Sequence, residues 1–91
     1  MGKIEWSSPA KDDLYEIHSR ISKDSLRFAD AFIDEIISKV FLLEKHPRIG
    51  KRILRVDHDA LRELLIQNHR VIYSIEKDRI FILRVLHSSI I

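Results

Sequence analysis

The sequence contains no cysteine, only two glycines and two prolines, and no long hydrophobic run. Without cysteine the chain forms neither a disulfide nor a thiolate metal site, which suits a reducing compartment. No apolar stretch approaches the roughly 20 residues that a membrane-spanning helix needs. The first residues also lack the apolar core of a signal peptide. We therefore expect a cytoplasmic protein with no membrane segment, built from long regular elements that few glycines or prolines interrupt.

What is present indicates one folded domain over residues 1–91. The chain is 45% hydrophobic and 33% charged, which excludes a disordered polymer. The net charge is only +2, but basic residues are concentrated in the second half. The densest basic stretch holds Arg48, Lys51, Arg52 and Arg55 with no acid among them. Such a patch can attract phosphate groups, although a solvated loop is the simpler interpretation.

A short strand and an amphipathic helix are predicted at the N-terminus. Ile4–Trp6 is the strand candidate, and the following Ser-Ser-Pro is typical of a helix start. We expect Ser8 to cap this helix, with Pro9 at its first helical position. Apolar residues at spacings of three and four then continue to about Lys23.

A second helix of about 20 residues is predicted after a short connection. Asp24 or Ser25 is expected to cap it, and a wide apolar stripe follows. His46-Pro47 should end it, because the residue before a proline resists helical angles. The two helices then form an antiparallel hairpin.

Three strands are predicted after the loop Arg48–Asp59, at Leu61–Ile66, Arg70–Glu76 and Arg79–His87. The short connections at Gln67-Asn68 and Lys77-Asp78 make them antiparallel neighbours. The fold class is therefore α+β, in the order β-α-α-β-β-β. We expect the helical hairpin to pack on one face of a mostly antiparallel four-stranded sheet, because that face is its only large apolar partner. The other face is expected to stay partly open.

Several common chemistries lack their motifs. The five histidines form no helical ligand pair, and His58 between Asp57 and Asp59 is only a weak candidate, so we predict no metal site. The sequence has no GxSxG turn, no P-loop and no GxGxxG motif. A serine hydrolase and a nucleotide-binding protein are therefore unsupported, and no cofactor is predicted.

Charged residues inside apolar strands are the most informative feature. Arg70 and Arg84 each lie among apolar neighbours. Removing an unpaired cation from water at such a place costs on the order of several kcal/mol. A guanidinium can hold a phosphate through two parallel hydrogen bonds, and the nearby His87 can move protons during RNA cleavage. The alternatives are that His87 merely ends its strand and that Arg84 pairs with a carboxylate, for which the candidates are Glu5, Glu63 and Glu76.

Short motifs in a fixed order cover nearly the whole chain. W-S-x-x-A-x-x-D-L-x-x-I runs from Trp6 to Ile17, and H-P-x-x-G-K covers His46 to Lys51. The C-terminal half holds L-R-E-L, H-R-V-I-Y and I-L-R-V-L-H, which begin at Leu61, His69 and Ile82. Together they resemble the RelE/ParE superfamily of toxins from type II toxin–antitoxin modules. The resemblance implies a compact toxin that a cognate antitoxin protein holds inactive.

The resemblance also implies one of two activities. RelE-like members cut messenger RNA on the ribosome without a metal, whereas ParE-like members bind and poison DNA gyrase without catalysis. In the first case Arg70 matches a phosphate-contacting arginine and His87 lies near a histidine used as acid or base. The expected substrate-binding residues are then Lys51, Arg52, Arg55, Tyr73 and Arg84.

Arg70 and the basic loop make RNA cleavage the first hypothesis and gyrase inhibition the second. Many relatives place an arginine shortly after the final histidine, but here that stretch is Ser88–Ile91 and holds none. This departure weakens the nuclease hypothesis. It leaves a degenerate, weakly active toxin as a third alternative.

Overall fold

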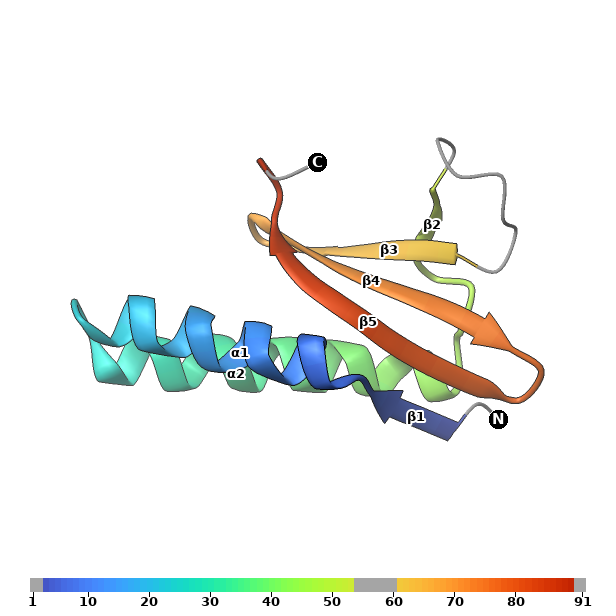
Figure 1. Ribbon diagram of the computed structural model, residues 1–91, viewed down its shortest axis with the longest axis horizontal. Coiled ribbons are helices and arrows are strands. Elements are labelled where there is room, and N and C mark those ends of the chain that lie inside the picture. Colours follow the sequence, from blue (N-terminus) through green and yellow to red (C-terminus); the bar gives the residue numbers. More distant parts are fainter. Residues whose placement is uncertain (1–2, 54–60, 90–91) are drawn as a thin grey trace.

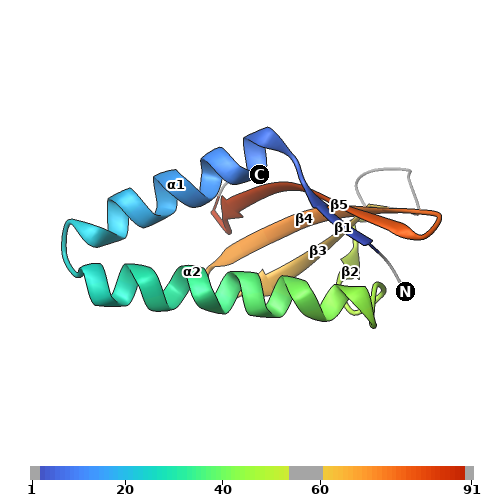
Figure 2. The same ribbon diagram turned by 90° about the horizontal axis from the view of Figure 1, so that it is seen from below.

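Two helices cover one face of a five-stranded sheet in the computed structural model, which describes residues 3–53 and 61–89 (Figures 1 and 2). The predicted order of elements is confirmed, with one short strand added. The elements are β1 (Lys3–Trp6), α1 (Ser8–Ser22), α2 (Leu26–Phe41), the 3-10 turn η1 (Leu42–Glu44), β2 (Lys51–Arg52), β3 (Leu61–Ile66), β4 (His69–Glu76) and β5 (Arg79–His87).

The sheet has the strand order β1-β5-β4-β3-β2. β1 runs parallel to β5, and every other pair is antiparallel. The expected sheet of four strands gains β2, which forms where only a loop was predicted. The two hairpin turns begin at Gln67 and Lys77, whose φ angles of 52° and 57° are positive. A positive φ at the first position of a two-residue turn gives the turn a twist that matches the right-handed twist of the flanking strands.

The helix starts follow the sequence with one correction. Ser7, and not Ser8, caps α1, because its hydroxyl oxygen accepts the Ala10 N–H at 3.1 Å. The same hydroxyl donates to the Leu83 carbonyl of β5 at 2.9 Å, so the cap also fixes the helix to the sheet. Ser25 caps α2 as predicted. That helix ends at Phe41, a few residues before the proline, and the 3-10 turn completes the segment.

A bulge in β5 decides which side chains face the helices. β4 pairs Ile72 with Arg84 but Tyr73 with Ile82, so Leu83 is an extra residue in β5. Side chains therefore alternate regularly between the two faces up to Ile82, and the alternation is reversed beyond the bulge. Val85 joins the helix-facing side of the sheet, and Arg84 moves to the opposite face.

The core lies between the helices and this face of the sheet. Its largest fully buried side chains are Ile36, Val40, Leu43, Ile66, Val71, Tyr73, Ile80 and Ile82. They come from the apolar stripes of the helices and from alternate strand positions. Among the helices of the described residues, none is long and apolar enough to cross a membrane.

Candidate functional site

Arg70 lies on the open face of the sheet and is already engaged by a carboxylate. Its Nη1 donates to Glu63 Oε1 of the neighbouring β3 at 3.2 Å. The side chains are only 14% and 24% exposed, so water screens this ion pair less than a surface pair. An incoming phosphate would have to compete with Glu63 for the guanidinium, because the two anions use the same donors.

Arg84 is paired too, but its partner is none of the three glutamates that the sequence offered. Its Nε and Nη2 donate to both carboxylate oxygens of Asp13 in α1, at 2.8 and 3.0 Å. Glu63 pairs with Arg70 instead, and Glu5 pairs with Arg79. Arg84 lies in β5 beyond the end of β1, where Asp13 in the first turns of α1 is within reach.

Asp13 also accepts a hydrogen bond from the β5 backbone at the same edge of the sheet. The Val85 N–H donates to its Oδ2 at 2.8 Å, on the side of β5 that lies beyond the last β1 pair, Trp6 with Ile82. Burial alone would raise the pKa of Asp13, but the hydrogen bonds from Arg84 and Val85 outweigh it. The pKa of Asp13 is therefore lowered, and the carboxylate is held in its charged form.

Tyr73 belongs to the core and not to an accessible site. It has no exposed surface, and its hydroxyl donates to the Pro47 carbonyl at 2.8 Å while accepting the Gly50 N–H at 2.9 Å. Burial raises its pKa. A Cβ atom on Gly50 would lie 2.5 Å from the Tyr73 oxygen and 2.7 Å from the Glu63 carbonyl, so only glycine fits here. Tyr73 thus positions the chain that leads into β2.

Two of the three predicted loop cations form a strand. Lys51 and Arg52 make up β2, opposite Glu63 and Arg62 of β3, and both side chains are exposed. Arg62 supports the approach to this strand, because its Nη1 donates to the Gly50 carbonyl at 2.8 Å. Arg55 and the weak metal candidate His58 lie outside the described residues. Within the described chain, no group of three possible metal ligands lies together.

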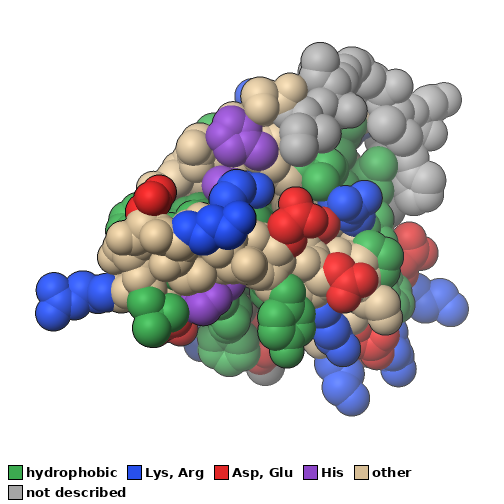
Figure 3. Space-filling model, turned by 60° about the vertical axis from the view of Figure 1, so that its left-hand side comes forward, with side chains coloured by type: hydrophobic (Ala, Val, Ile, Leu, Met, Phe, Trp, Pro, Cys, Tyr) green, Lys and Arg blue, Asp and Glu red, His purple; other side chains and the backbone are tan. Residues whose placement is uncertain are grey.

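His87 lines a hollow of about 470 Å³ where the ends of β4 and β5 approach the helices. Its ring lies 5.2 Å from that of His69, edge to face. The other lining residues are Arg20, Ile21, Phe28, Phe32, Gln67 and Asn68. On the face drawn in Figure 3, histidine side chains lie directly beside basic ones, with acidic side chains nearby.

The polar groups of this hollow are joined by hydrogen bonds. Asn68 contacts both imidazoles, with Oδ1 2.9 Å from His69 Nδ1 and Nδ2 3.3 Å from His87 Nε2. Arg20 Nη2 lies 3.5 Å from His69 Nε2. Burial lowers the pKa of His69, and the nearby His87 and Arg20 lower it further. The lowered pKa favours the neutral form of His69, and the side chain of His87 stays partly exposed.

Sequence reasoning missed His69, Asn68 and Arg20 as members of this cluster. His69 lies just before the strand predicted from Arg70, which in fact begins at His69, and Asn68 lies in the predicted turn. Arg20 lies almost fifty positions earlier, on a helix whose rotation the sequence does not fix to one residue. The pairing of His69 with His87 across β4 and β5 is the signal that could have found two of them.

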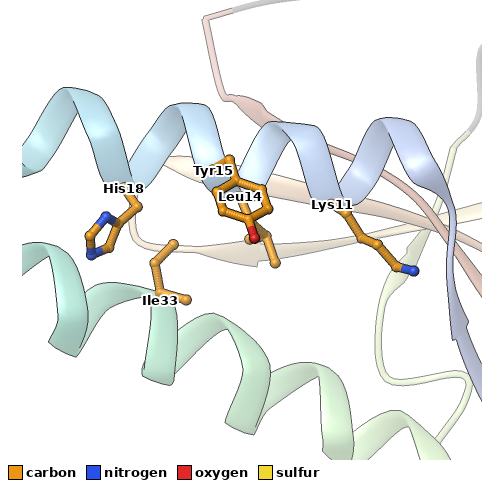
Figure 4. A pocket seen from close by; sticks show the side chains of 5 residues that line it. All are labelled: Lys11, Leu14, Tyr15, His18 and Ile33. Atoms are coloured by element: carbon orange, nitrogen blue, oxygen red, sulfur yellow. The ribbon is translucent and has the colours of Figure 1, made fainter.

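A second hollow of about 470 Å³ lies between the helices on their outer side (Figure 4). Lys11, Leu14, Tyr15 and His18 of α1 and Ile33 of α2 line it. Tyr15 is 79% exposed, and further apolar side chains of the hairpin are exposed as well, namely Leu26, Phe28, Ile37 and Phe41. Exposed apolar side chains gathered on one element are typical of a protein-binding surface.

A comparison with models of protein families identifies the family of this chain. A family model described as "ParE toxin of type II toxin-antitoxin system, parDE" matches residues 4–91. No curated protein shows significant sequence similarity to this chain.

Solved structures share the fold at low sequence identity. A chain of the chromosomal ParDE system from P. aeruginosa superposes with a TM-score of 0.79 at 19% identity, covering 96% of each chain. A chain of the RelBE2 toxin–antitoxin complex from Mycobacterium tuberculosis gives 0.69 at 22% identity, covering 94% of this chain and 96% of the other. A YoeB/ParE toxin from Agrobacterium tumefaciens gives 0.61 at 16% identity, covering 93% and 96%.

Proposed function

Because the chain belongs to the ParE toxin family of type II toxin–antitoxin systems, we propose that it inhibits growth by binding DNA gyrase without catalysis. A cognate antitoxin protein holds it inactive, as the ParDE and RelBE2 systems pair a toxin with an antitoxin. Gyrase acts on chromosomal DNA, so the proposal places the protein in the cytoplasm.

The main support for this proposal is that both strand arginines, Arg70 and Arg84, are already paired with carboxylates. Arg70 pairs with Glu63 and Arg84 with Asp13, so each guanidinium already holds a carboxylate. A nuclease needs preorganised cations that neutralise the phosphate as charge develops on it. Exchanging an internal carboxylate for a phosphate would add a cost that preorganised sites avoid. Exposed apolar side chains on the helical hairpin suit contact with a protein instead.

Expression without antitoxin separates the two activities. We expect DNA breaks that depend on gyrase, loss of supercoiling activity in a purified assay, and unchanged messenger RNA ends. Arg70→Ala should still inhibit gyrase if the variant is folded, because Arg70 contacts no target in this proposal. Intact supercoiling in arrested cells would count against gyrase as the target.

RNA cleavage is kept as a second candidate because of the hollow at His87. Two imidazoles and Arg20 meet there, and one imidazole is accessible. In this alternative His87 transfers protons, Arg70 leaves Glu63 to hold the phosphate, and the exposed Lys51 and Arg52 hold the RNA backbone.

The second candidate makes its own prediction. Sequencing of RNA ends after induction should show new cuts that disappear in both His87→Gln and Arg70→Ala. The same cuts in either variant would reject the roles given to these residues. A chain that causes no growth arrest at all, although folded, would instead be the weakly active toxin that the missing C-terminal arginine allows.

A further inference from the structure

Among residues 3–53 and 61–89, no strand pairs with the outer edge of β1. β1 is the last strand of the sheet on its side, next to β5 (Figure 1). Lys3 N–H donates to Asp78 O at 2.8 Å and Ser7 N–H to Ile82 O at 2.9 Å, so the odd-numbered residues bond to the β5 side. Because peptide groups alternate along a strand, the N–H and C=O of Ile4 and Trp6 point to the free edge.

An apolar groove lies beside that edge. It has a volume of about 290 Å³ and is lined by Lys3, Ile4 and Trp6 of β1 and by Ile37, Val40, Phe41 and Glu44 of the helical layer. Phe41 is 64% exposed and Ile37 is 46% exposed. A free strand edge next to exposed apolar side chains favours the addition of another strand, which would cover both.

We propose that the strand added here is β1 of a second copy of this chain, antiparallel and related by a two-fold axis. The axis passes beside Ile4, which faces Ile4 of the partner subunit and exchanges both backbone hydrogen bonds with it. One sheet then runs continuously through both subunits. The grooves beside the two strands lie on the same side of that sheet, because a two-fold axis perpendicular to the sheet keeps both helical layers on one face.

Charge at the edge selects this register. Only pairings that set outward-pointing backbone groups opposite each other are possible, so Ile4 faces either Ile4 or Trp6 of the partner subunit. With Ile4 facing Ile4, each Lys3 lies opposite Glu5 of the partner subunit, twice by symmetry. In the other register, in which Ile4 faces Trp6 of the partner subunit, Glu5 lies opposite Glu5 of the partner subunit. Opposite charges in directly opposed pairs stabilise a sheet and like charges destabilise it.

Lys3 and Glu5 would also lie at positions where opposed side chains come close together. Their own peptide groups bond toward β5, so they form the non-hydrogen-bonded pair of the new ladder, in which side chains approach most closely. Both side chains are exposed, while Ile4 and Trp6 pack toward the core. Glu5 also pairs with Arg79 of its own subunit. Its carboxylate stays on the face of the sheet where Lys3 of the partner subunit would lie. The proposal is independent of the toxin's target.

Charge reversal tests the register. Lys3→Glu makes the edge wholly acidic and Glu5→Lys makes it wholly basic, so each variant should dissociate at least about ten times more readily than the parent. A mixture of the two variants restores both pairs and should associate as a heterodimer. Sedimentation equilibrium measures all three samples, and circular dichroism confirms that each variant is folded. A parent chain that stays monomeric to about 1 mM, or a mixture that does not associate, overturns the proposal.

Cysteine pairs give a second test, because the chain has no cysteine of its own. Opposed residues in a non-hydrogen-bonded pair have Cα atoms about 4.5 Å apart, within the range of a disulfide. Lys3→Cys mixed with Glu5→Cys should therefore form an intersubunit disulfide under oxidised glutathione. Neither variant alone should do so, since like positions lie about 7–8 Å apart across the strands. Cross-linking of either variant alone, to the extent seen in the mixture, would contradict the register.

An antitoxin strand is the other occupant that could fill this edge. If the parent chain is monomeric and Lys3→Glu weakens its binding to the antitoxin, then the edge belongs to the antitoxin and the homodimer proposal fails. If the parent dimerises and Lys3→Glu leaves antitoxin binding unchanged, the edge belongs to the second copy.

Discussion

Asp13 joins a helix to a strand edge through three hydrogen bonds. Its carboxylate satisfies Arg84 and the Val85 N–H together, at the place where β1 no longer covers β5. The side chain is only 13% exposed, so its removal leaves polar groups that water reaches poorly. A residue that reads in the sequence as an ordinary helix acid is therefore a fixed link between the two layers.

We expect Asp13→Ala to lower the free energy of unfolding by about 1–3 kcal/mol at neutral pH, because Arg84 and Val85 lose their acceptor. Urea denaturation measures the change. The neighbouring Asp12→Ala is the matched control and should stay within about 0.5 kcal/mol of the parent, since Asp12 is exposed. Equal losses in both variants would show that the link contributes nothing specific.

The same link sets an acid limit on stability. Because the folded-state pKa of Asp13 lies below its ordinary value of 3.8, its stabilising effect is complete above that value. The effect disappears as the pH falls through the lower, folded-state pKa. The difference in unfolding free energy between the parent and Asp13→Ala should therefore shrink only below pH 3.8.

His69 should make stability depend on pH nearer to neutrality. Burial lowers its pKa in the folded state below 6.5, so the unfolded chain takes up the proton at a higher pH. The free energy of unfolding should therefore fall as the pH drops below 6.5, until the folded state is protonated as well. His69→Gln cannot titrate and should flatten this dependence in denaturation measured from pH 8 to 5, whereas the exposed His46→Gln should leave it nearly unchanged. An equal slope in the parent and in His69→Gln would refute this assignment.

At the scale of elements, the regular segments could be predicted and the bulge could not. Apolar periodicity and turn residues gave β3 and β5 their observed bounds, because each local signal agreed with the final fold. An extra residue in a strand leaves no such signal when nearly all of the nearby side chains are apolar, as from Ile80 to Leu86. One extra residue at Leu83 was enough to reverse the face of Arg84. Its partner, Asp13, comes from α1 and not from a strand.

The candidate site was harder to predict than the fold for the same reason. The sequence correctly indicated that a cation in these strands needs an anion, because that follows from desolvation alone. It could not distinguish an internal carboxylate from a bound phosphate. The pairing of Arg70 with Glu63 depends on strand register, and the gathering of Arg20, His69 and His87 depends on how the helix rotates against the sheet.

The segment before β2 is held by one glycine against one tyrosine. We expect Gly50→Ala to destabilise the chain by about 1–3 kcal/mol, because a methyl group there overlaps the Tyr73 ring and the Glu63 backbone. β2 should also separate from β3, which amide hydrogen exchange at Lys51 and Arg52 would detect. Ile49→Ala, at an exposed neighbouring position, is the control and should protect β2 as well as the parent does. Unchanged exchange in Gly50→Ala would show that the segment can move aside freely.

At the scale of the whole molecule, the sheet depends on a strand from the far end of the described chain. β5 lies between β1 and β4, so it completes the ladders on both sides (Figure 2). It also provides Ile80, Ile82 and Val85 to the core. The helical hairpin and the other strands therefore cannot close a common core without it.

A chain that ends at Asp78 should consequently lack a cooperative fold. We expect it to show no sharp urea transition and little dispersion in its proton NMR spectrum, since β1 loses its only neighbour and half the strand-side core is gone. A chain that ends at Ser89 is the control and should unfold cooperatively, because it keeps every helix and strand described. A sharp transition in the shorter chain would mean that the helical hairpin and the strands before β5 form an independent unit.

The place of β5 has a genetic consequence. During synthesis the ribosome releases this strand after all the others, so no growth-inhibiting molecule exists until that point has been passed. A frameshift within the codons of β5 should abolish toxicity as fully as one near the start codon. Spontaneous survivors selected in the absence of antitoxin should thus carry disabling lesions spread along the gene as far as that last stretch.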